Sequence, residues 1–391
     1  MPTGDGMCCG DRTPDVLRTP ITPAAAAPSA CNRREGGVPL AKKVRFLSRP
    51  SSYPDRPRHV TTVETHMSWV FLTDQQAYKL KKPVRHPFLN FGTVEARRRN
   101  CRAELRLNRR LAPEVYLSVL PLTADPDGRL RLSGQGRIVD WVVKMRRLPQ
   151  ERTLEHAIKH REVRAADLRR VAALLAKFYC AAAPVEIKGA TYRHRFEVNV
   201  RANRRELAKP DWRLPAELVR SITAAQRTFL RRQARLLEDR ARDRRIVEGH
   251  GDLRPEHVYL GDQPVITDCL EFNRTFRILD PADELAFLAL ECERLGAPEV
   301  DRGLFETYSQ ITGDHPSEIL VNFYKTDRAC LRAKLAIWHL KEPDVRQRSK
   351  WRRRAIEYLG LAARYAAALS RRGVRPPSNE EATDLSAGAK L

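Results

Sequence analysis

The spacing of apolar positions along the chain changes near residue 150. Before that point, short runs rich in β-branched and aromatic residues alternate with polar positions, which is the two-residue period of β-strands. The predicted strands span residues 59–64, 69–72, 77–81, 115–122 and 138–145. Four polar residues, 73–76, separate the second strand from the third and predict a hairpin. One helix is predicted among these strands, at 94–111, with Cys101 and Asn108 on one face and arginines on the others.

After residue 150 the period becomes helical. Apolar residues recur at i, i+3 and i+4 spacing, which marks amphipathic helices, in the segments 168–182, 216–242, 283–295, 317–340 and 351–369. A short strand–turn–strand island, residues 249–268, lies among them. The pattern therefore predicts a small β-rich lobe, residues 39–148, followed by a larger helical lobe, residues 149–371.

The two ends of the chain have no periodic apolar pattern. Residues 1–38 are rich in Pro, Ala, Thr and Gly, and residues 372–391 are mostly polar. Segments of this composition cannot bury enough apolar surface to offset their ordering entropy, so we expect disordered tails. Residues 1–38 have a second interpretation, an over-extended gene start with translation beginning near Leu40.

The composition excludes a wholly disordered protein and makes nucleic-acid binding a question to be weighed. Hydrophobic residues make up 42% of the 391 residues, which excludes wholesale disorder. The 72 Lys and Arg residues exceed the 48 Asp and Glu residues, giving a formal net charge of +24 that is typical of nucleic-acid-binding proteins. The arginines lie on predicted helices, however, and the aromatic residues, 7% of the chain, do not interleave with them. We therefore interpret the arginine clusters as solvated helix faces and expect no nucleic-acid partner.

The sequence indicates neither a membrane span nor a disulfide framework. No segment approaches 18 consecutive apolar residues, and the polar N-terminus lacks the apolar stretch of a signal peptide. We expect a cytoplasmic protein without a membrane span. The eight cysteines include no C-x-x-C pair, so we expect neither a disulfide framework nor a structural zinc site, and most thiols should be small buried apolar groups.

The candidate chemistry lies in the strand–turn–strand island. Asp252 stands in the motif His250-Gly251-Asp252, and Asp268 directly follows a short apolar strand. Phosphoryl transfer requires one carboxylate that orients and deprotonates the acceptor hydroxyl and another that holds the metal ion on the phosphates. Asp252 and Asp268 occur in the chain order that these roles require.

This motif and the Asp that follows it resemble those of the aminoglycoside phosphotransferase family, a branch of the protein-kinase-like fold. The resemblance extends from about Leu40 to beyond Ala297 and is strongest to a bacterial subgroup of unassigned substrate. Some members of that subgroup carry an additional P-loop kinase domain. No G-x-x-x-x-G-K-[ST] motif occurs in this sequence, so we expect the single-domain form.

The resemblance implies an α+β, bilobal protein-kinase-like fold, with a small antiparallel β-sheet N-lobe that carries one helix and a larger, mainly helical C-lobe. It implies an ATP-dependent phosphotransferase that moves the γ-phosphate to a hydroxyl group of a small molecule. Asp252 is then the catalytic base and Asp268 the ligand of Mg²⁺. The expected partners are the nucleotide and a small-molecule acceptor, and no motif indicates the acceptor or the oligomeric state.

In kinase-like folds a strand lysine contacts the α- and β-phosphates, and a helix glutamate holds that lysine. By resemblance Lys79 is the better match for the lysine, and Lys81, on the same face of the strand, is the alternative. Glu104 is the better match for the glutamate, and Glu95 is the alternative.

Two further segments correspond to nucleotide-binding parts of the fold. The loop at 64–69 occupies the position of the nucleotide-covering hairpin, but it contains no glycine. Phosphate contacts would therefore come from backbone N–H groups near Ser68 and from the Ser68 hydroxyl. Residues 143–148 correspond to the segment that joins the lobes, whose backbone would meet the adenine.

One departure from the family pattern concerns the metal. His257 stands five residues after Asp252, where the family has a metal-binding Asn. Mg²⁺ prefers oxygen ligands, whereas imidazole suits Mn²⁺ better, so Mn²⁺ is an alternative. Three interpretations stay open: one metal suffices, His257 acts through another ion or on the phosphate, or activity is impaired. Glu271 and Asn273 are further candidates for oxygen ligands.

Three other functions are compatible with these residues. The first is a nucleotide-binding regulator of the same fold without transfer activity, which His257 and the glycine-poor loop would explain. The second is a metallophosphatase site made of His250, Asp252 and His257, and the third is nucleic-acid binding through the arginine faces. In the leading interpretation, His250 braces the catalytic loop by hydrogen bonding, and Asp280 and Asp283 cap the helix that follows.

Overall fold

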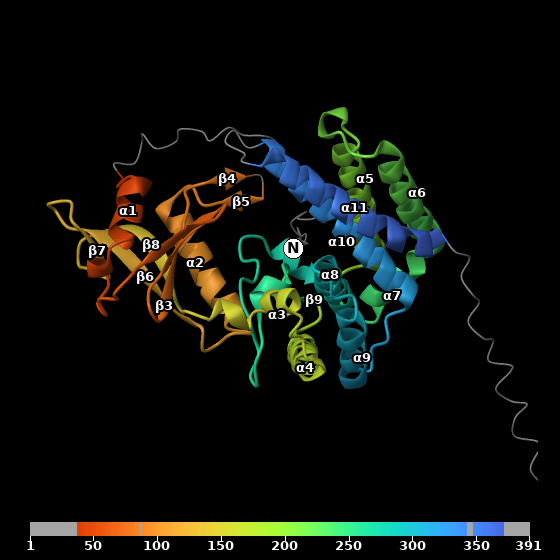
Figure 1. Ribbon diagram of the computed structural model, residues 1–391, viewed down its shortest axis with the longest axis horizontal. Coiled ribbons are helices and arrows are strands. Elements are labelled where there is room, and N and C mark those ends of the chain that lie inside the picture. Colours follow the sequence, from red (N-terminus) through yellow and green to blue (C-terminus); the bar gives the residue numbers. More distant parts are fainter. Residues whose placement is uncertain (1–36, 87, 342–346, 371–391) are drawn as a thin grey trace, which may run out of the picture.

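The computed structural model describes residues 37–86, 88–341 and 347–370. The predicted tails, 1–38 and 372–391, lie outside the described residues except for Gly37 and Val38. The chain forms two lobes, of which the first is built on a β-sheet and the second is mainly helical (Figure 1). The predicted α+β class, with a small antiparallel sheet followed by a larger helical region, is confirmed.

The first lobe is built on a six-stranded antiparallel sheet with the strand order β1-β2-β3-β8-β6-β7. The strands are β1 (Thr61–Glu64), β2 (Ser68–Leu72), β3 (Gln76–Lys81), β6 (Tyr116–Ala124), β7 (Leu130–Leu132) and β8 (Arg137–Arg146). The N–H and the hydroxyl of Thr73 both donate to the Gln76 carbonyl, which closes the turn between β2 and β3 and confirms the predicted hairpin. A small hairpin of β4 (Arg85–His86) and β5 (Leu89–Asn90) follows β3 and was not indicated by the apolar period.

The two faces of the sheet have different partners, because alternate residues of a strand point to opposite sides. Tyr78 and Leu80 of β3 pack in the apolar cluster that includes Leu47 of α1 (Leu40–Leu47). Lys79 and Lys81 point to the other face, where α2 (Val94–Asn108) packs. The helix α2 was predicted from the sequence, whereas α1 was not.

Arginines of the predicted helices are not all solvated. Arg97 of α2 is 4% exposed, and its guanidinium forms a bidentate pair with the buried Asp140 of β8 at 2.7 and 3.0 Å. Lys43 of α1 donates to the same carboxylate at 2.7 Å. The interpretation of the arginine clusters as solvated faces is therefore wrong for Arg97, and also for Arg240, which is 8% exposed.

The helices of the second lobe pack around two apolar clusters. They are α3 (Leu154–His160), α4 (Ala165–Ala181), α5 (Gly189–Leu207), α6 (Ala216–Arg232), α7 (Ala234–Arg242), α8 (Pro281–Arg294), α9 (Val300–Thr312), α10 (Glu318–Trp338) and α11 (Arg348–Ser370). Helix α8 belongs to both clusters, with Ala286 and Leu290 in one and Leu285 and Leu288 in the other. It is therefore the central helix of the lobe.

The helices differ in two respects from the apolar pattern. The segment 216–242, predicted as one helix, is two helices, because Gln233 leaves the helical region with φ −121° and ψ 23°. The apolar period continues across this break and cannot reveal it. The pattern also does not predict α3, α5 or α9.

The island at 249–268 forms short strands, as the pattern predicts. β10 (Val258–Tyr259) pairs with β11 (Val265–Ile266), and β9 (Val247–Glu248) pairs with β12 (Ile278–Leu279), both antiparallel. The motif with Asp252 lies between β9 and β10, and Asp268 follows β11.

The described helices and cysteines bear on the expectations of no membrane span and of buried thiols. Among the residues that the structure describes, no helix has both the length and the apolarity needed to cross a membrane. The described cysteines carry free thiols, and all but Cys180 are buried, namely Cys101, Cys269, Cys292 and Cys330. Cys8, Cys9 and Cys31 lie outside the described residues.

A buried ionic group fixes the start of α8. The Arg240 guanidinium of α7 donates to Asp280 at 2.6 and 2.7 Å and to Asp314 at 2.5 and 2.6 Å. The hydroxyl of Tyr324 donates to Asp280, and that of Tyr308 donates to Asp314. One arginine is therefore shared by two buried carboxylates.

We predict that Arg240→Met lowers the free energy of unfolding by about 3–5 kcal/mol, because the substitution leaves two buried carboxylates without a cation. Urea denaturation followed by circular dichroism measures this loss. Arg242→Met is the matched control on the same helix, since the Arg242 side chain is 71% exposed, and it should cost less than about 1 kcal/mol. Equal losses in the two variants would contradict the role of Arg240.

Candidate active site

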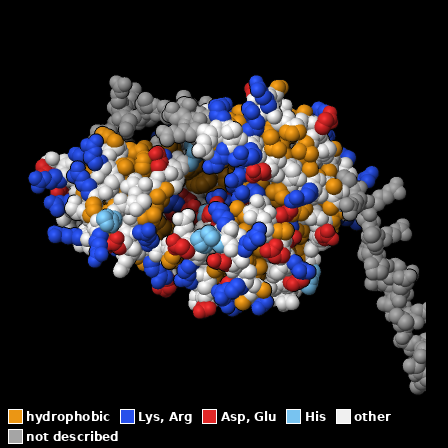
Figure 2. Space-filling model, in the orientation of Figure 1, with side chains coloured by type: hydrophobic (Ala, Val, Ile, Leu, Met, Phe, Trp, Pro, Cys, Tyr) orange, Lys and Arg blue, Asp and Glu red, His pale blue; other side chains and the backbone are white. Residues whose placement is uncertain are grey.

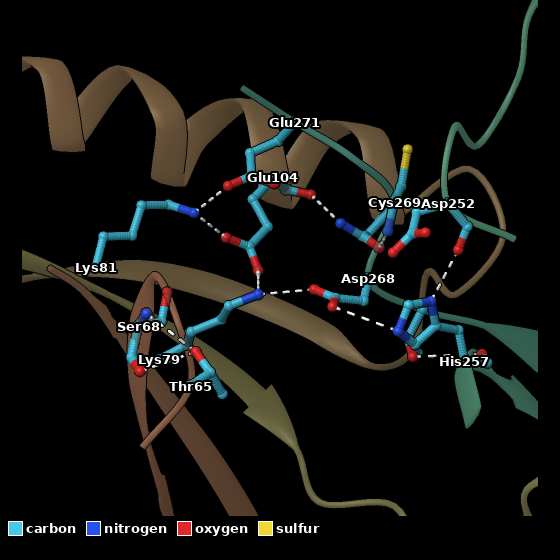
Figure 3. A network of polar contacts seen from close by, with 12 residues as sticks. Thr65, Ser68, Lys79, Lys81, Glu104, Asp252, His257, Asp268, Cys269 and Glu271 are labelled. Carbon is cyan, nitrogen blue, oxygen red and sulfur yellow. Dashed lines mark hydrogen bonds and ion pairs between the residues drawn. The ribbon is translucent and has the colours of Figure 1, made fainter. Parts of the chain in front are cut away.

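A chain of ionic contacts links the sheet, α2 and the loop after β11 (Figure 3). Lys79 Nζ lies 2.9 Å from Glu104 Oε1 and 2.7 Å from Asp268 Oδ1. Glu104 comes from the inner face of α2 and is completely buried. The structure therefore brings together three residues that the resemblance assigns to nucleotide and metal binding, although Lys79 and Asp268 are 189 positions apart.

Lys81 lies on the same face of β3 and completes this group. Glu104 Oε2 accepts a hydrogen bond from Lys81 Nζ at 2.6 Å, and the Glu271 carboxylate accepts another. Lys81 has no exposed side-chain surface, whereas Lys79 keeps 16% of its side chain exposed. The geometry thus favours Lys79 as the lysine that reaches a phosphate, with Lys81 holding Glu104. Glu271, a further candidate for an oxygen ligand of the metal, pairs with Lys81 through Oε1.

These contacts keep Lys79 and Asp268 in their charged forms. Burial acts to raise the pKa of Asp268, but Lys79, His257 and Arg254 outweigh it and hold the pKa well below its usual value. For Lys79, burial acts to lower the pKa, but Asp268 and Glu104 raise it well above the ordinary value. Both groups are therefore ionised at neutral pH.

The turn that carries Asp268 is fixed by the first lobe. Asp268 has φ 61°, in the left-handed region that a residue with a side chain rarely adopts. Its N–H donates to the Tyr116 hydroxyl of β6 at 3.1 Å, and the next N–H, of Cys269, donates to Asn108 Oδ1 at 2.8 Å. Sequence reasoning did not identify Tyr116 or Asn108 as site residues. Asn108 could have been found as the polar residue on the apolar face of its helix.

His250 joins the two loops that carry the carboxylates. Its Nε2 lies 2.9 Å from the Thr267 carbonyl, so Nε2 carries the proton, and its Nδ1 accepts from the Asp252 N–H at 3.3 Å. Burial, the largest influence, lowers the pKa of the ring, so His250 stays neutral. It acts as the brace that the sequence predicts. Because both ring nitrogens are engaged, the metallophosphatase interpretation loses one of its three ligands.

Glu284 of α8 supports the loop that carries Asp252. Its carboxylate accepts the N–H of His250 at 2.9 Å, the N–H of Gly251 at 2.5 Å and the Tyr179 hydroxyl at 2.9 Å. A Cβ at Gly249 would lie 2.6 Å from Glu284 Oε2, so only glycine permits this close approach. Sequence reasoning missed Glu284. The sequence did contain a signal for Glu284, because it is an acidic residue among the apolar residues of a helix that is buried on all sides.

Asp252 is 30% exposed and faces cationic groups. Arg254 Nε donates to Asp252 Oδ2 at 3.1 Å, and Arg254 Nη1 donates to Glu256 at 2.5 Å. Burial acts to raise the pKa of Asp252, but Arg254, His257 and Arg332 outweigh it and lower the pKa below its usual value. The described contacts of this carboxylate involve Oδ2.

His257 lies between the two carboxylate loops, and Figure 3 shows it beside Asp268. Its Nδ1 lies 2.9 Å from the Asp252 carbonyl and therefore carries the proton. Its Nε2 lies 3.2 Å from Arg254 Nη2 and 3.6 Å from Asp268 Oδ2. The lone pair of Nε2 accordingly faces both a hydrogen-bond donor and the carboxylate that is expected to hold the metal.

The residues around Asp268 fit a metal ion that is shared with a nucleotide. Asp268 is 46% exposed and offers oxygen, which Mg²⁺ prefers. Within the described ranges, no three or more His, Cys, Asp or Glu side chains are grouped so that they could hold a metal alone. Mg²⁺ in nucleotide sites is bound by one or two carboxylates together with phosphate and water. Asp268 suits such a site, whereas a closed protein cage is not present in this part of the chain.

Ser68 lies at the end of the glycine-free hairpin. Its N–H donates to Thr65 Oγ1 at 3.0 Å, and its carbonyl accepts from the Thr65 N–H at 2.8 Å. These bonds close the turn without glycine and occupy the N–H that was expected to meet a phosphate. Ser68 pairs with Lys81 and is 2% exposed.

Other residues singled out from the sequence lie outside this group. Glu95 is 57% exposed and pairs with Arg98 on its own helix. Asn273 caps the short helix that follows it. Asp280 caps α8 as predicted, but Asp283 does not, because it forms a bidentate pair with Arg328.

A cavity of about 230 Å³ lies where the segment that joins the lobes faces the β10–β11 hairpin. Its lining includes Arg146 and Leu148 of that segment and Tyr259 and Val265 of the hairpin. The resemblance places the adenine against the same joining segment. Figure 2 shows the surface hollowed between the two lobes, with acidic side chains visible in the hollow.

Comparison with known sequences identifies relatives without a known activity. No protein-family model matches the chain. The uncharacterized protein Rv2004c of Mycobacterium tuberculosis and the uncharacterized protein Mb2027c of Mycobacterium bovis are each 33% identical to it over 280 residues. The alignment covers 70% of this chain and 53% of each relative. The chain thus spans about half the length of the curated relatives that it matches.

The solved structures that resemble this chain include a choline/ethanolamine kinase family protein and an ethanolamine kinase. A choline/ethanolamine kinase family protein from Mesorhizobium loti has a TM-score of 0.49 and 15% identity, over 83% of this chain and 98% of that protein. An ethanolamine kinase of Plasmodium vivax has a TM-score of 0.42 and 8% identity, over 78% of this chain and 82% of that one. Both TM-scores are below 0.5, so these similarities do not indicate the activity of this chain.

We predict that Asp268 stabilises the fold above pH 3.8, the ordinary carboxyl pKa, and that this contribution is lost as the pH falls. The lowered pKa means that the folded state binds the proton less readily than the unfolded chain does. Between about pH 5 and pH 2, the wild type should lose more free energy of unfolding than Asp268→Asn. Urea titrations at each pH test this. Asp262→Asn, at a fully exposed side chain, should follow the wild type, and parallel curves for all three proteins would contradict the prediction.

Proposed function

We propose that the chain is an ATP-dependent phosphotransferase of the aminoglycoside phosphotransferase family, which moves the γ-phosphate to a hydroxyl group of a small molecule. The observation that carries this proposal is the contact of Lys79 with both Glu104 and Asp268. A strand lysine, a helix glutamate and a loop aspartate from two lobes meet beside the loop of Asp252. This is the set of groups that binding and transfer of a nucleotide phosphate require.

The nucleotide would bind between the lobes. Lys79, held by Glu104, would contact the α- and β-phosphates. Asp268 and His257 would hold Mg²⁺, or Mn²⁺, which suits an imidazole ligand better. Such an ion, when bound, neutralises charge on the phosphates.

Transfer requires that the acceptor hydroxyl attack the γ-phosphorus in line with the leaving group. A bond forms between the hydroxyl oxygen and the γ-phosphorus, the bond to the bridging oxygen breaks, and ADP leaves. Asp252 orients the hydroxyl and receives its proton on Oδ1, because the described contacts engage Oδ2. The lowered pKa of Asp252 keeps it ionised, and a weak base of this kind takes the proton late in the reaction.

We predict that Asp252→Asn lowers phosphate transfer by about 10³-fold, because the amide cannot accept the hydroxyl proton. The measurement is transfer from γ-labelled ATP to a metabolite panel, with nucleotide affinity followed by calorimetry. ATP affinity should stay within about twofold, since Asp252 touches the acceptor rather than the nucleotide. Asp262→Asn should behave as the wild type. Equal transfer by Asp252→Asn and the wild type would remove Asp252 as the base.

A second candidate is a nucleotide-binding regulator that has lost transfer. The observation in its favour is that His257 Nε2 lies 3.2 Å from Arg254 Nη2, so the nitrogen expected to bind a metal can accept a hydrogen bond instead. In that case a metal-binding side chain of the family is replaced by a purely structural one. ATP binding without turnover in the presence of either Mg²⁺ or Mn²⁺ would favour this candidate.

We predict that His257→Asn shifts metal preference from Mn²⁺ toward Mg²⁺ by about tenfold, because an amide oxygen replaces an imidazole nitrogen. Calorimetric titration of each ion, in the presence of a non-hydrolysable ATP analogue, measures the preference without turnover. Transfer rates with each ion give a second readout. Unchanged affinities for both ions would show that His257 does not touch the metal.

A further inference from the structure

The turn that carries Asp268 takes its shape from groups of both lobes, and the inference drawn from it rests on the proposed function. Asp268 follows β11 in the second lobe, whereas its N–H donates to the Tyr116 hydroxyl of β6 in the first lobe at 3.1 Å. The next N–H, of Cys269, donates to Asn108 Oδ1 of α2 at 2.8 Å. Two consecutive N–H groups therefore have their acceptors on the first lobe.

The backbone of Asp268 does not favour this shape by itself. Its φ of 61° lies in the left-handed region, which is disfavoured for a residue with a side chain by roughly 5- to 30-fold. A glycine would adopt the same φ without this cost, but it would supply no carboxylate. Hydrogen bonds to the turn are therefore needed to hold Asp268 in a conformation that it would otherwise leave.

The second lobe holds the residues on either side of this pair. The Thr267 carbonyl lies 2.9 Å from His250 Nε2, and the Leu270 N–H donates to the His250 carbonyl at 3.1 Å. The N–H groups of Asp268 and Cys269 lie between these contacts. They are the part of the turn that depends on the first lobe.

Both acceptors on the first lobe are held rigidly. Asn108 is 1% exposed, and its Nδ2 donates to the Glu104 carbonyl at 2.9 Å, which leaves Oδ1 directed at the N–H of Cys269. Tyr116 is 2% exposed and packs in the same apolar cluster as Val143 of β8. Neither acceptor can move without disturbing the packing of the first lobe.

The direction of the Asp268 carboxylate follows from this backbone. Because φ sets where the Cα–Cβ bond points relative to the preceding peptide, a return to the right-handed region would turn the carboxylate away. Oδ1 lies 2.7 Å from Lys79 Nζ and Oδ2 lies 3.6 Å from His257 Nε2, and Figure 3 shows Asp268 between these two side chains. The shape of the turn thus decides whether the carboxylate points to the place where the proposed function requires a metal ion.

We propose that Tyr116 and Asn108 are positioning residues of the metal site, which hold the Asp268 turn in its left-handed form and thereby set the affinity for the metal ion. They act through the backbone of Asp268 and Cys269. Groups that orient a metal ligand in this way commonly change metal affinity by about 10- to 100-fold. Here the left-handed strain sets the scale, so loss of one acceptor should lower the affinity by about tenfold.

The test uses Tyr116→Phe, which removes the hydroxyl and keeps the buried ring. Calorimetric titration with Mn²⁺, in the presence of a non-hydrolysable ATP analogue, should give an affinity about tenfold below that of the wild type. Affinity for the analogue alone, measured in EDTA, should stay as in the wild type, because Lys79 keeps its contact with Glu104. A merely structural role would not lower one affinity and spare the other.

Asn108→Ala tests the same role independently, also in the case that Tyr116→Phe does not fold. It should lower Mn²⁺ affinity in the same direction. The variant with both substitutions should lose less than the product of the two single losses, because the left-handed strain is released only once. Full multiplication of the two losses would contradict an action through one shared turn.

Tyr192→Phe is the matched control, because it also removes a buried tyrosine hydroxyl. Tyr192 is 1% exposed and lies in a helical cluster of the second lobe, with its hydroxyl 3.4 Å from that of Tyr324. Its Mn²⁺ affinity should equal that of the wild type, even where its thermal midpoint falls as far as that of Tyr116→Phe. An unchanged Mn²⁺ affinity in Tyr116→Phe, or equal losses in the two variants, would overturn the proposal.

The proposed function has a separate failure, which Asp268→Asn detects. This variant should lose most of the Mn²⁺ affinity if Asp268 holds the ion. No Mn²⁺ binding by the wild type, or wild-type affinity in Asp268→Asn, would overturn both the metal site and the role of its positioning residues. A loss in Asp268→Asn with none in Tyr116→Phe would overturn only the latter.

Discussion

The buried carboxylate of Glu104 is the group on which the arrangement of the first lobe and of the candidate site depends. It accepts a hydrogen bond from Lys81 and forms an ion pair with Lys79 at 2.9 Å. These lysines in turn pair with Glu271 and Asp268. Removing an ion from water costs several kcal/mol, so such a group persists only when its charges compensate each other. Two lysines and three carboxylates leave one negative charge in excess. That excess suits the divalent cation of the proposed function.

The second lobe holds the loop that carries Asp252 in place. Helix α8 is packed on both sides, its start is fixed by the Arg240–Asp280 pair, and Glu284 in its first turn holds the backbone of the loop. The first lobe fixes the other loop, through Tyr116 and Asn108. Each carboxylate is therefore held by a rigid element, and His250 connects the two loops directly. The proposed phosphate transfer would require this preorganisation of charged groups.

The net charge of +24 has a different meaning once positions are known. Arg97 and Arg240 neutralise buried carboxylates, and Arg328 pairs with Asp283. Arg195 is bound only to backbone carbonyls among its described hydrogen bonds, and burial lowers its pKa. A count of charges cannot distinguish these roles from a polyanion-binding surface.

The amino-acid sequence determined the α+β class, most of the strands and helices, and the pair Asp252 and Asp268, because these depend on local period and on residues close together in a motif. It also indicated Lys79 and Glu104, but only through resemblance, and it left Lys81 and Glu95 as alternatives. The tertiary structure favours Lys79 and Glu104, since burial and contact with Asp268 arise from strands and helices that are distant in the chain. Glu284, Tyr116 and the pairing of Arg332 with Glu291 belong to the structure alone. Their roles consist of contacts across long sequence separations, which no local pattern records.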